Sequence, residues 1–255
     1  MKHQKQHALL PLSPVTRTTL IVLLVSMLLL GGIFWGSLII NSFVAIDASL
    51  ANLFFAARTT QGLMFFYGVS FLGEAWIVLI AAGVLSCTLF LHKQKLLALG
   101  VWLSIVPGEG ITYLSKLFFH RERPILAAVA EDSFSFPSNH ATIAILFYGF
   151  LTYLLLKKVT SWYARLAILL GSLLLIILID TSRLYLGVHY LSDILAGNLV
   201  GLASLLFAIF SMEWICRRTS AIHWNRFSLT VILPSLFCLL GIVLFLCLRT
   251  PLLFS

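Results

Sequence analysis

Residues 182–212 read SRLYLGVHYLSDILAGNLVGLASLLFAIFSM, and two different patterns meet in this stretch. Its first part carries serine, arginine, histidine and aspartate, whereas the part from Ile194 to Met212 is almost entirely apolar. A helix rises about 1.5 Å per residue, so an apolar run of this length crosses roughly 30 Å of hydrocarbon. The stretch therefore predicts a membrane-spanning helix with a polar cluster at one end.

The composition of the whole chain agrees with a membrane protein. Of its 255 residues, 60% are hydrophobic and 10% are charged, and the mean hydropathy is +1.04. A soluble domain carries about a quarter charged residues, so soluble, fibrous and disordered classes are excluded. The four cysteines make no CxxC pair and suggest neither a zinc site nor a disulfide framework. We predict an all-α fold, a polytopic transmembrane helical bundle.

Seven apolar segments predict about seven membrane spans, with a six-helix core-like arrangement. They are Thr19 to Ile40, Ala75 to Leu91, Leu97 to Ser115, Ala141 to Leu156, Ala164 to Ile179, Ile194 to Met212 and Phe227 to Leu248. We divide the chain into an N-terminal tail with the first span and an external loop (1–59), a helical bundle (60–212), and a basic loop with an additional C-terminal span (213–255). The second half of the segment from Asn41 to Gly73 is expected at the membrane interface.

Glycines indicate where these helices approach one another. Gly197 and Gly201 form a GxxxG pattern on the sixth segment, and Gly108 and Gly110 flank Glu109 on the third. Small residues allow helix backbones to approach closely within a membrane. We therefore expect a tight bundle from the second to the sixth segment, with the first and seventh at its periphery.

Lys and Arg residues are unevenly distributed between the two sides that seven crossings define. One side carries eleven: Lys2, Lys5, Arg17, Lys93, Lys95, Lys157, Lys158, Arg165, Arg217, Arg218 and Arg226. The other carries six: Arg58, Lys116, Arg121, Arg123, Arg183 and Arg249. Positively charged loops stay in the cytoplasm, so the N-terminus is predicted inside and loops 116–140 and 180–193 outside. The net charge of +8 then reflects topology and indicates no nucleic-acid partner.

Three polar clusters lie at the predicted outer ends of helices. They read KLFFHRERP over 116–124, FPSNHA over 136–141 and SRLYLGVHYLSD over 182–193. Polar residues are costly near a bilayer, so clusters of them indicate a functional site. A single cluster would be a weak signal, but three in order on one side of the membrane favour a common site.

The basic residues of these clusters suit an anionic ligand. Lys116, Arg123 and Arg183 can bring three positive charges to one phosphate, and a planar guanidinium donates to two phosphate oxygens at once. The competing interpretation is that basic side chains merely extend to lipid headgroups, which suits Lys157 and Lys158 better.

The remaining polar residues suit phosphoryl transfer. If Ser138 caps the helix that follows, the N–H groups of Asn139 and His140 point outward with the helix dipole behind them. His189 and Asp193 lie four apart, so on a helix they share a face, and the carboxylate can accept from one ring nitrogen while the other faces phosphorus. His140 is then suited to protonate the leaving oxygen.

Together the clusters resemble the tripartite signature of the type 2 phosphatidic acid phosphatase superfamily, which includes vanadium haloperoxidases. That signature is K-x6-RP, then PSGH, then SR-x5-H-x3-D, and the resemblance covers roughly residues 60–212. The chain has Lys116-x6-Arg123-Pro124, Pro137-Ser138-Asn139-His140 and Ser182-Arg183-x5-His189-x3-Asp193. Asn139 alone departs, since the family has glycine there. Asparagine tolerates unusual backbone angles, but its amide could narrow the pocket.

The resemblance implies a role for each matching residue. His189 attacks phosphorus, Asp193 orients it and His140 is the general acid. The residues implied to hold the phosphate are Lys116, Arg123, Ser138, Asn139, Ser182 and Arg183. It implies a metal-free, cofactor-free phosphohistidine mechanism on a lipid phosphate in the bilayer, with phosphatidate, phosphatidylglycerophosphate, undecaprenyl diphosphate or lipid A as candidate substrates.

Two other functions remain open at this point. A phosphotransferase of the same fold would pass the phosphate to an acceptor other than water. A non-enzymatic lipid-binding or transport protein would explain basic residues among helices, but it would not explain a His-x3-Asp pair beside a second histidine.

Five further polar residues receive weaker assignments. Glu109 lies two helical turns before the motif lysine, so it could line the pocket floor or tune that lysine, with a helix-packing hydrogen bond as the alternative. His120 and Arg121 are expected to contact headgroups. Glu74 and Asp180 lie near helix ends and are expected to be solvated.

Overall fold

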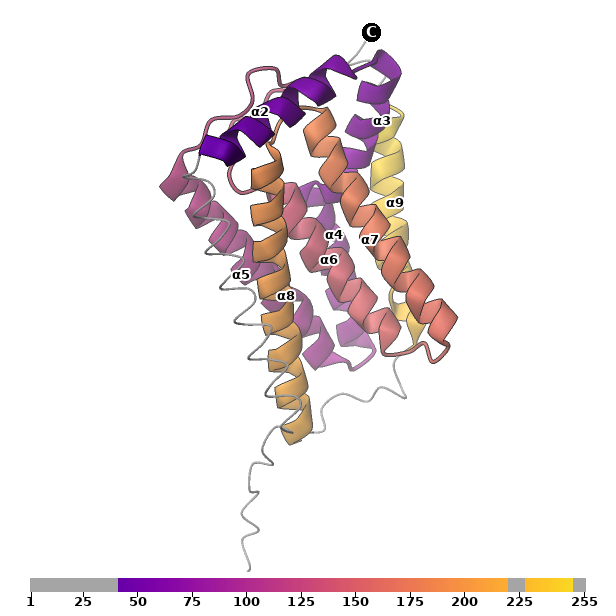
Figure 1. Cartoon of the computed structure of the whole chain (residues 1–255). Coiled ribbons are helices and arrows are strands. Elements are labelled where there is room, and N and C mark those ends of the chain that lie inside the picture. Colours follow the sequence, from indigo (N-terminus) through magenta and orange to yellow (C-terminus); the bar gives the residue numbers. More distant parts are fainter. Residues whose placement is uncertain (1–40, 220–227, 250–255) are drawn as a thin grey trace, which may run out of the picture.

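The computed structural model describes residues 41–219 and 228–249, where every regular element is helical (Figure 1). The elements are α2 (Asn41–Ala56), α3 (Thr60–Ser70), the 3-10 turn η1 (Phe71–Gly73), α4 (Ala75–Leu91), α5 (Lys95–Phe119), α6 (Asn139–Leu156), α7 (Trp162–Tyr185), α8 (Leu191–Thr219), the 3-10 turn η3 (Leu229–Val231) and α9 (Leu233–Cys247). The predicted all-α class is confirmed.

The described residues do not confirm the expected count of seven spans. Within the described residues, the four helices from α5 to α8 are long and apolar enough to cross a membrane. The pair formed by Thr60–Gly73 and α4 also qualifies, although it bends by 42°. Helix α9 is shorter, and the predicted span from Thr19 to Ile40 lies outside the described residues. By length and hydropathy, the described residues therefore hold four candidate spans, or five with the bent pair.

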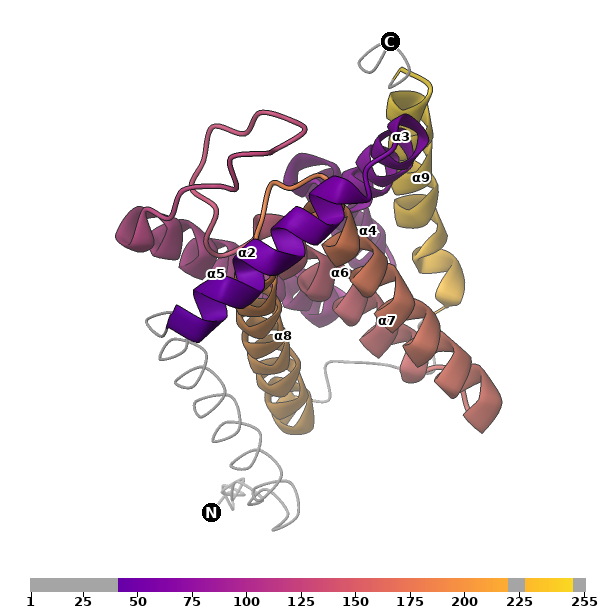
Figure 2. The same ribbon diagram turned by 45° about the horizontal axis from the view of Figure 1, so that its top comes forward.

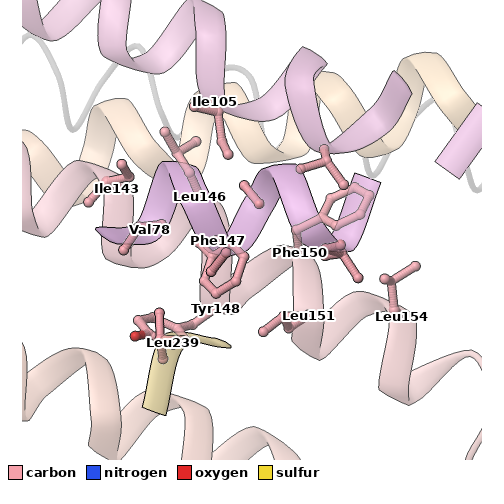
Figure 3. Close-up of a cluster of buried hydrophobic side chains, with 14 of the residues drawn as sticks. Val78, Ile105, Ile143, Leu146, Phe147, Tyr148, Phe150, Leu151, Leu154 and Leu239 are labelled. Carbon is pink, nitrogen blue, oxygen red and sulfur yellow. The ribbon is translucent and has the colours of Figure 1, made fainter. Parts of the chain in front are cut away.

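Helix α6 is the central helix and packs against α4, α5, α7 and α8. Its side chains Phe147 and Phe150 are almost completely buried, and Figure 3 shows them in one cluster with Val78 of α4 and Ile105 of α5. Only 6% of the apolar window of α7 is buried, so that helix presents its leucines to lipid. Lipid tails are as apolar as leucine, so helix association in a membrane depends on close packing and polar contacts.

Close packing of α6 on α8 depends on the two glycines of the GxxxG pattern. A Cβ on Gly197 would collide with the carbonyl oxygen of Ser138, and a Cβ on Gly201 would lie 2.8 Å from that of Thr142. The hydroxyl of Thr142 lies 3.1 Å from the carbonyl oxygen of Gly197 and 3.1 Å from the hydroxyl of Thr112 on α5. The expected contact is confirmed, and one buried threonine joins three helices there.

The two glycines beside Glu109 behave differently from each other. A Cβ on Gly108 would lie 2.6 Å from Leu146 of α6, so this glycine does allow a close approach. A Cβ on Gly110 would meet nothing within 4 Å, because that side of α5 faces open space. The expectation of close packing is therefore confirmed for Gly108 and wrong for Gly110.

Helix α2 lies across the end of the bundle that carries the three polar clusters, here called the site end (Figures 1 and 2). The sequence patterns predict no helix there. The second half of the 41–73 segment, expected at the membrane interface, forms α3, which packs against α7 and α9 and continues through η1 into α4. Its interfacial position stays a prediction. Aromatic packing fixes α3, with the rings of Phe66 and Tyr185 centred 4.4 Å apart.

We expect Gly201→Ala to lower the thermal stability of the purified protein in detergent. Alanine normally stabilises a helix interior by about 0.5–1 kcal/mol relative to glycine, but here the new methyl would lie 2.8 Å from a carbonyl of α6. Gly171→Ala on α7 is the matched control, since a Cβ there meets nothing within 4 Å. Equal midpoints of thermal unfolding for the two variants would contradict this account of the contact.

Candidate active site

The polar clusters meet in a cavity of about 350 Å³ at the site end. Five of the nine predicted site residues line it, namely Lys116, Arg123, Asn139, His140 and His189. A second cavity of about 220 Å³ is lined in part by Arg183. Both cavities have Glu74 and Glu131 in their walls, so these two carboxylates stand between them.

The first cluster is shaped by the end of α5. His120 adopts a left-handed conformation with φ 44°, which ends the helix and turns the chain into the 120–138 loop. Its ring packs edge-on against Phe134, with the ring centroids 4.5 Å apart, so His120 has a turn-forming role. Its expected headgroup contact stays a prediction. Lys116, in the last turn of α5, donates to the carbonyl of Phe134. The loop and the lysine thereby fix each other.

Two guanidinium groups converge on one carboxylate that the sequence analysis missed. Arg183, buried in the last turn of α7, donates to Ser70 at 2.5 Å and to Glu131. Arg123 Nη2 lies 3.0 Å from the other oxygen of Glu131. Burial alone would raise the pKa of Glu131, but Arg183 and Arg123 lower it to about 2. An ionised carboxylate therefore occupies the point where the two arginines meet.

Arg123 is held from several sides. Its Nε donates to the carbonyl of Ser133 at 2.7 Å, and its Nη1 donates to that of Val188 at 2.8 Å. Nη1 also lies 3.3 Å from Nε2 of His189. These contacts join the 120–138 loop to the loop after α7. Among the described residues, no three His, Cys, Asp or Glu side chains are grouped to hold a metal ion.

Ser138 precedes α6 at the capping position, as predicted, but its side chain makes no capping hydrogen bond. Within the described part of the chain, its buried hydroxyl has no hydrogen-bond partner. The backbone N–H of Ser138 donates to the carbonyl of Asp193 at 2.9 Å, which ties the start of α6 to α8. Ser138 is completely buried and lines neither cavity, so its phosphate-binding role stays a prediction.

Ser182 is the one predicted phosphate ligand whose hydroxyl is turned away. It donates to the carbonyl of Ile179 at 2.6 Å and lines neither cavity. Its phosphate-binding role stays a prediction. Asp180 nearby is not solvated as expected: Asn198 of α8 donates to it at 2.7 Å. The expectation is wrong because this part of α7 faces a neighbouring helix.

Glu109 lines the cavity and does so beside the unusual Asn139, whose amide lies within hydrogen-bonding reach of the carboxylate. The expectation that Glu109 lines the pocket is confirmed, whereas its tuning of Lys116 and a helix-packing hydrogen bond stay predictions. Asn139, which stands where the family pattern has glycine, is thus a lining residue of the cavity.

His189 and Asp193 come together by a different route from the one expected. The chain turns at Gly187, where φ is 67°, and α8 begins only at Leu191, so His189 lies before the helix and does not share a helix face. Its Nδ1 still lies 3.5 Å from Oδ2 of Asp193. That oxygen accepts from the backbone N–H of Tyr190 at 2.8 Å, as an acidic residue in the first turn of a helix commonly does.

The surroundings of His189 favour its neutral form. The side chain is buried, and burial together with the positive charges of Arg183, Arg123 and Lys116 lowers its pKa well below the usual range. A neutral imidazole has a lone pair on one ring nitrogen, which is the form a nucleophile requires.

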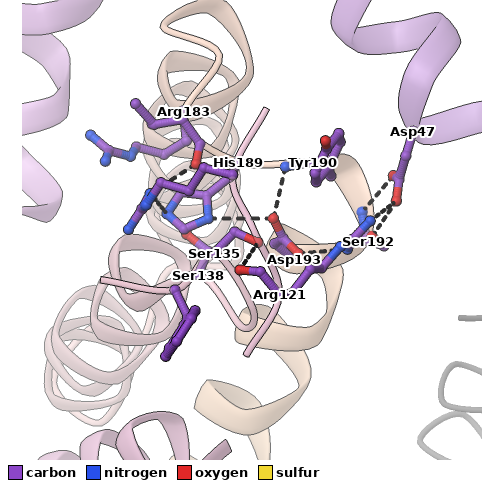
Figure 4. A network of polar contacts seen from close by, with 12 residues as sticks. Asp47, Arg121, Ser135, Ser138, Arg183, His189, Tyr190, Ser192 and Asp193 are labelled. Atoms are coloured by element: carbon purple, nitrogen blue, oxygen red, sulfur yellow. Dashed lines mark hydrogen bonds and ion pairs between the residues drawn. The ribbon is translucent and has the colours of Figure 1, made fainter. Parts of the chain in front are cut away.

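Arg121 holds the aspartate in place, and its expected headgroup contact is wrong. Its guanidinium donates to Asp193 at 2.7 Å, to Ser192 at 2.6 Å and to Asp47 of α2 at 2.8 Å (Figure 4). The ring of Tyr190 lies 4.4 Å below it. Both carboxylates are almost completely buried, so they need this shared positive charge. The only sequence signal for Asp47 is a lone carboxylate in an apolar segment.

Comparisons with known proteins agree with this arrangement. Residues 96–218 match the family described as the PAP2 superfamily. Phosphatidylglycerophosphatase B of Bacillus subtilis (strain 168) is 30% identical over 143 residues, which cover 55% of this chain and 69% of that protein. The chain belongs to the PAP2 superfamily. The predicted superfamily and phosphatase class are thereby confirmed.

Two further relatives of this PAP2 chain are informative. The crystal structure of the first transmembrane PAP2-type phosphatidylglycerolphosphate phosphatase from Bacillus subtilis superposes with a TM-score of 0.69 at 25% identity, covering 74% of this chain and 95% of that one. Bacitracin transport permease protein BcrC of Bacillus licheniformis is 39% identical over 89 residues, 35% of this chain and 37% of that protein. The structural likeness supports the multi-pass membrane fold.

We expect Arg121→Gln and Asp47→Asn to lower kcat by about 10- to 100-fold while KM changes little, as is typical when a partner that orients a reacting group is lost. The phosphate-facing arginines are untouched, so substrate affinity should survive. Steady-state phosphate release measures both constants, and Asp132→Asn, an exposed carboxylate of the same loop, is the control. An unchanged kcat, or a loss confined to KM, would show that the cluster does not orient the aspartate.

Proposed function

We propose that this protein hydrolyses the terminal phosphate of a membrane lipid phosphate or diphosphate through a phosphohistidine intermediate on His189. One observation carries the proposal: an ionised carboxylate, Glu131, is held between Arg123 and Arg183 beside a neutral, buried imidazole. A phosphate has the same charge sign and a similar fork of oxygens, so it fits the same place.

In the first step, the substrate phosphate displaces Glu131. Arg123, Arg183 and Lys116 neutralise its charge, and the free hydroxyl of Ser138 donates to one of its oxygens. The first-turn N–H groups of α6, including that of Asn139, add the positive end of the helix dipole. These groups also stabilise the additional charge of the transition state.

The chemistry then divides between the two histidines. Nε2 of His189 attacks phosphorus, the P–O bond to the leaving group breaks, and His140 gives its proton to the leaving oxygen. Asp193 accepts a hydrogen bond from Nδ1–H, which keeps its proton throughout, and the carboxylate stabilises the positive ring. Water next attacks the phosphohistidine, His140 takes the water's proton, and the P–N bond breaks to release phosphate and restore the neutral His189.

The lipid nature of the substrate is supported by the position of the cavity. It opens beside α5, where Tyr113 in its wall and Leu114 next to it are both largely exposed. A lipid could present its phosphate there while its tails stay in the bilayer. The relative from Bacillus subtilis is named for phosphatidylglycerophosphate, and we extend the class to other lipid phosphates.

We infer that the site faces the outside of the cell membrane. The loops opposite the site end carry Lys93 and Lys95 before or at the start of α5, and Lys157 and Lys158 after α6. These lysines contact none of the site residues described above, so we interpret them as signals of membrane orientation. Loops rich in positive charge remain in the cytoplasm.

Purified protein in detergent should release inorganic phosphate from at least one member of a panel containing phosphatidate, phosphatidylglycerophosphate and undecaprenyl diphosphate. The activity should persist in excess EDTA, because side chains already supply the positive charge, and vanadate should inhibit. Activity that is lost in EDTA and restored by magnesium would contradict the mechanism.

Unchanged lipid throughout the panel would contradict the function and favour binding or transport. Phosphate passed to an added acceptor without release would favour a phosphotransferase.

The two histidines should fail differently. We expect His189→Ala to abolish turnover and any acid-labile phosphoprotein trapped by rapid quench with labelled substrate. His140→Ala should lower kcat by about 10²–10⁴-fold with a lipid phosphate monoester. The loss of kcat should be smaller with a diphosphate, because its leaving phosphate needs little protonation. A labelled phosphoprotein that persists undiminished in His189→Ala would rule out His189 as the nucleophile.

A further inference from the structure

A second carboxylate–imidazole pair, Glu74 and His140, lies in the same cavity. Its carboxylate lies outside the three sequence clusters. Oε2 of Glu74 lies 3.2 Å from Nε2 of His140. The two side chains differ in exposure, at 35% for the glutamate and 8% for the histidine. The expectation that Glu74 is merely solvated is therefore wrong.

The bend between α3 and α4 produces this pair. Glu74 is the extended residue between η1 and α4, and its side chain makes no capping hydrogen bond to α4. A Cβ on Gly73 would lie 2.7 Å from Ile179 and 3.3 Å from the ring of His140, so the bend is pressed against the first turn of α6. Tyr148 of α6 donates to the carbonyl of Leu72 at 2.7 Å and holds the corner there.

The charges around His140 affect how readily its imidazole holds a proton. The charged groups that face the imidazole are Arg183 of α7, Glu131 of the 120–138 loop and Glu74. In the mechanism above, the phosphate displaces Glu131 from the arginines. Glu74 is then the carboxylate left beside His140 when the imidazole must carry a proton next to Arg183.

We propose that Glu74 is a positioning residue that keeps His140 protonated for its transfer to the leaving oxygen, an inference that rests on the proposed function. Among the described residues, Nε2 of His140 has no partner that meets hydrogen-bond geometry, although it lies close to Glu74. The same nitrogen can therefore donate to the substrate. Glu74 acts as the counter-charge of the imidazolium. It neither gains nor loses a proton in the net reaction.

The test uses Glu74→Gln in the full-length protein with two substrates that differ in leaving group. With phosphatidate, whose alkoxide must be protonated, we expect kcat to fall by about 10- to 100-fold with little change in KM. With p-nitrophenyl phosphate, whose phenolate leaves without a proton, the loss should stay below about threefold. The alkaline limb of the phosphatidate pH–rate profile should move to lower pH, because the imidazolium has lost its counter-charge.

Two other variants separate charge from structure. Glu74→Asp keeps the negative charge, so its pH profile should stay close to that of the unmodified protein even if kcat falls. Glu213→Gln removes a carboxylate that pairs with Lys157 far from the site, and we expect kcat to stay unchanged with both substrates. Inhibition by vanadate serves as the check that each variant retains its phosphate site.

The outcomes distinguish this inference from the proposed function. Suppose that the unmodified protein is active. The role of Glu74 is then overturned if Glu74→Gln lowers kcat equally with both substrates, or if the alkaline limb of the pH–rate profile does not move. Either result would leave the proposed phosphatase function standing. A complete loss of vanadate inhibition in Glu74→Gln would also overturn the role of Glu74, since the residue would then support the phosphate site itself. An unmodified protein inactive on every substrate would overturn both proposals.

Discussion

The convergence of Arg123 and Arg183 is the constraint on which the site depends. Two guanidinium groups aimed at one place repel each other and, in surroundings poor in water, need an anion between them. Glu131 fills that place in the substrate-free protein, held by both arginines. A phosphate can take it over only by offering at least as much negative charge. Under the proposed function, the same arrangement would favour a dianionic phosphate over a singly charged ligand.

The scaffold converts this local requirement into a fixed geometry. Apolar contacts around α6 give the bundle its shape, but they do not distinguish one helix rotation from another within a lipid environment. The close approach at Gly201 and the junction at Thr142 fix the rotation of α6 against α8. Because Ser138 is tied to the carbonyl of Asp193, that rotation also sets how the phosphate-facing end of α6 stands relative to the histidine loop.

The sequence predicts the helical class, the apolar segments that form α4 to α8 and five of the residues that line the main cavity, because these depend on local hydropathy and on motif spacing. It does not predict Asp47, Glu74 or Glu131 as site residues. Each lies in a segment with no motif of its own, and only tertiary packing brings it to its partner. The assumption that His189 and Asp193 share a helix face fails for a local reason: Gly187 turns the chain, and the helix starts two residues after the histidine.

The two carboxylate–imidazole pairs differ in a way that matches two separate tasks. Asp193 is completely buried and anchored by Arg121, so the imidazole it holds has one orientation and little contact with water. Such rigidity suits a nucleophile that must meet phosphorus along a fixed line. Glu74 is partly exposed and stands in the wall of both cavities. A histidine beside it can exchange its proton with the water that enters once the leaving group departs, which is what an acid that later becomes a base requires.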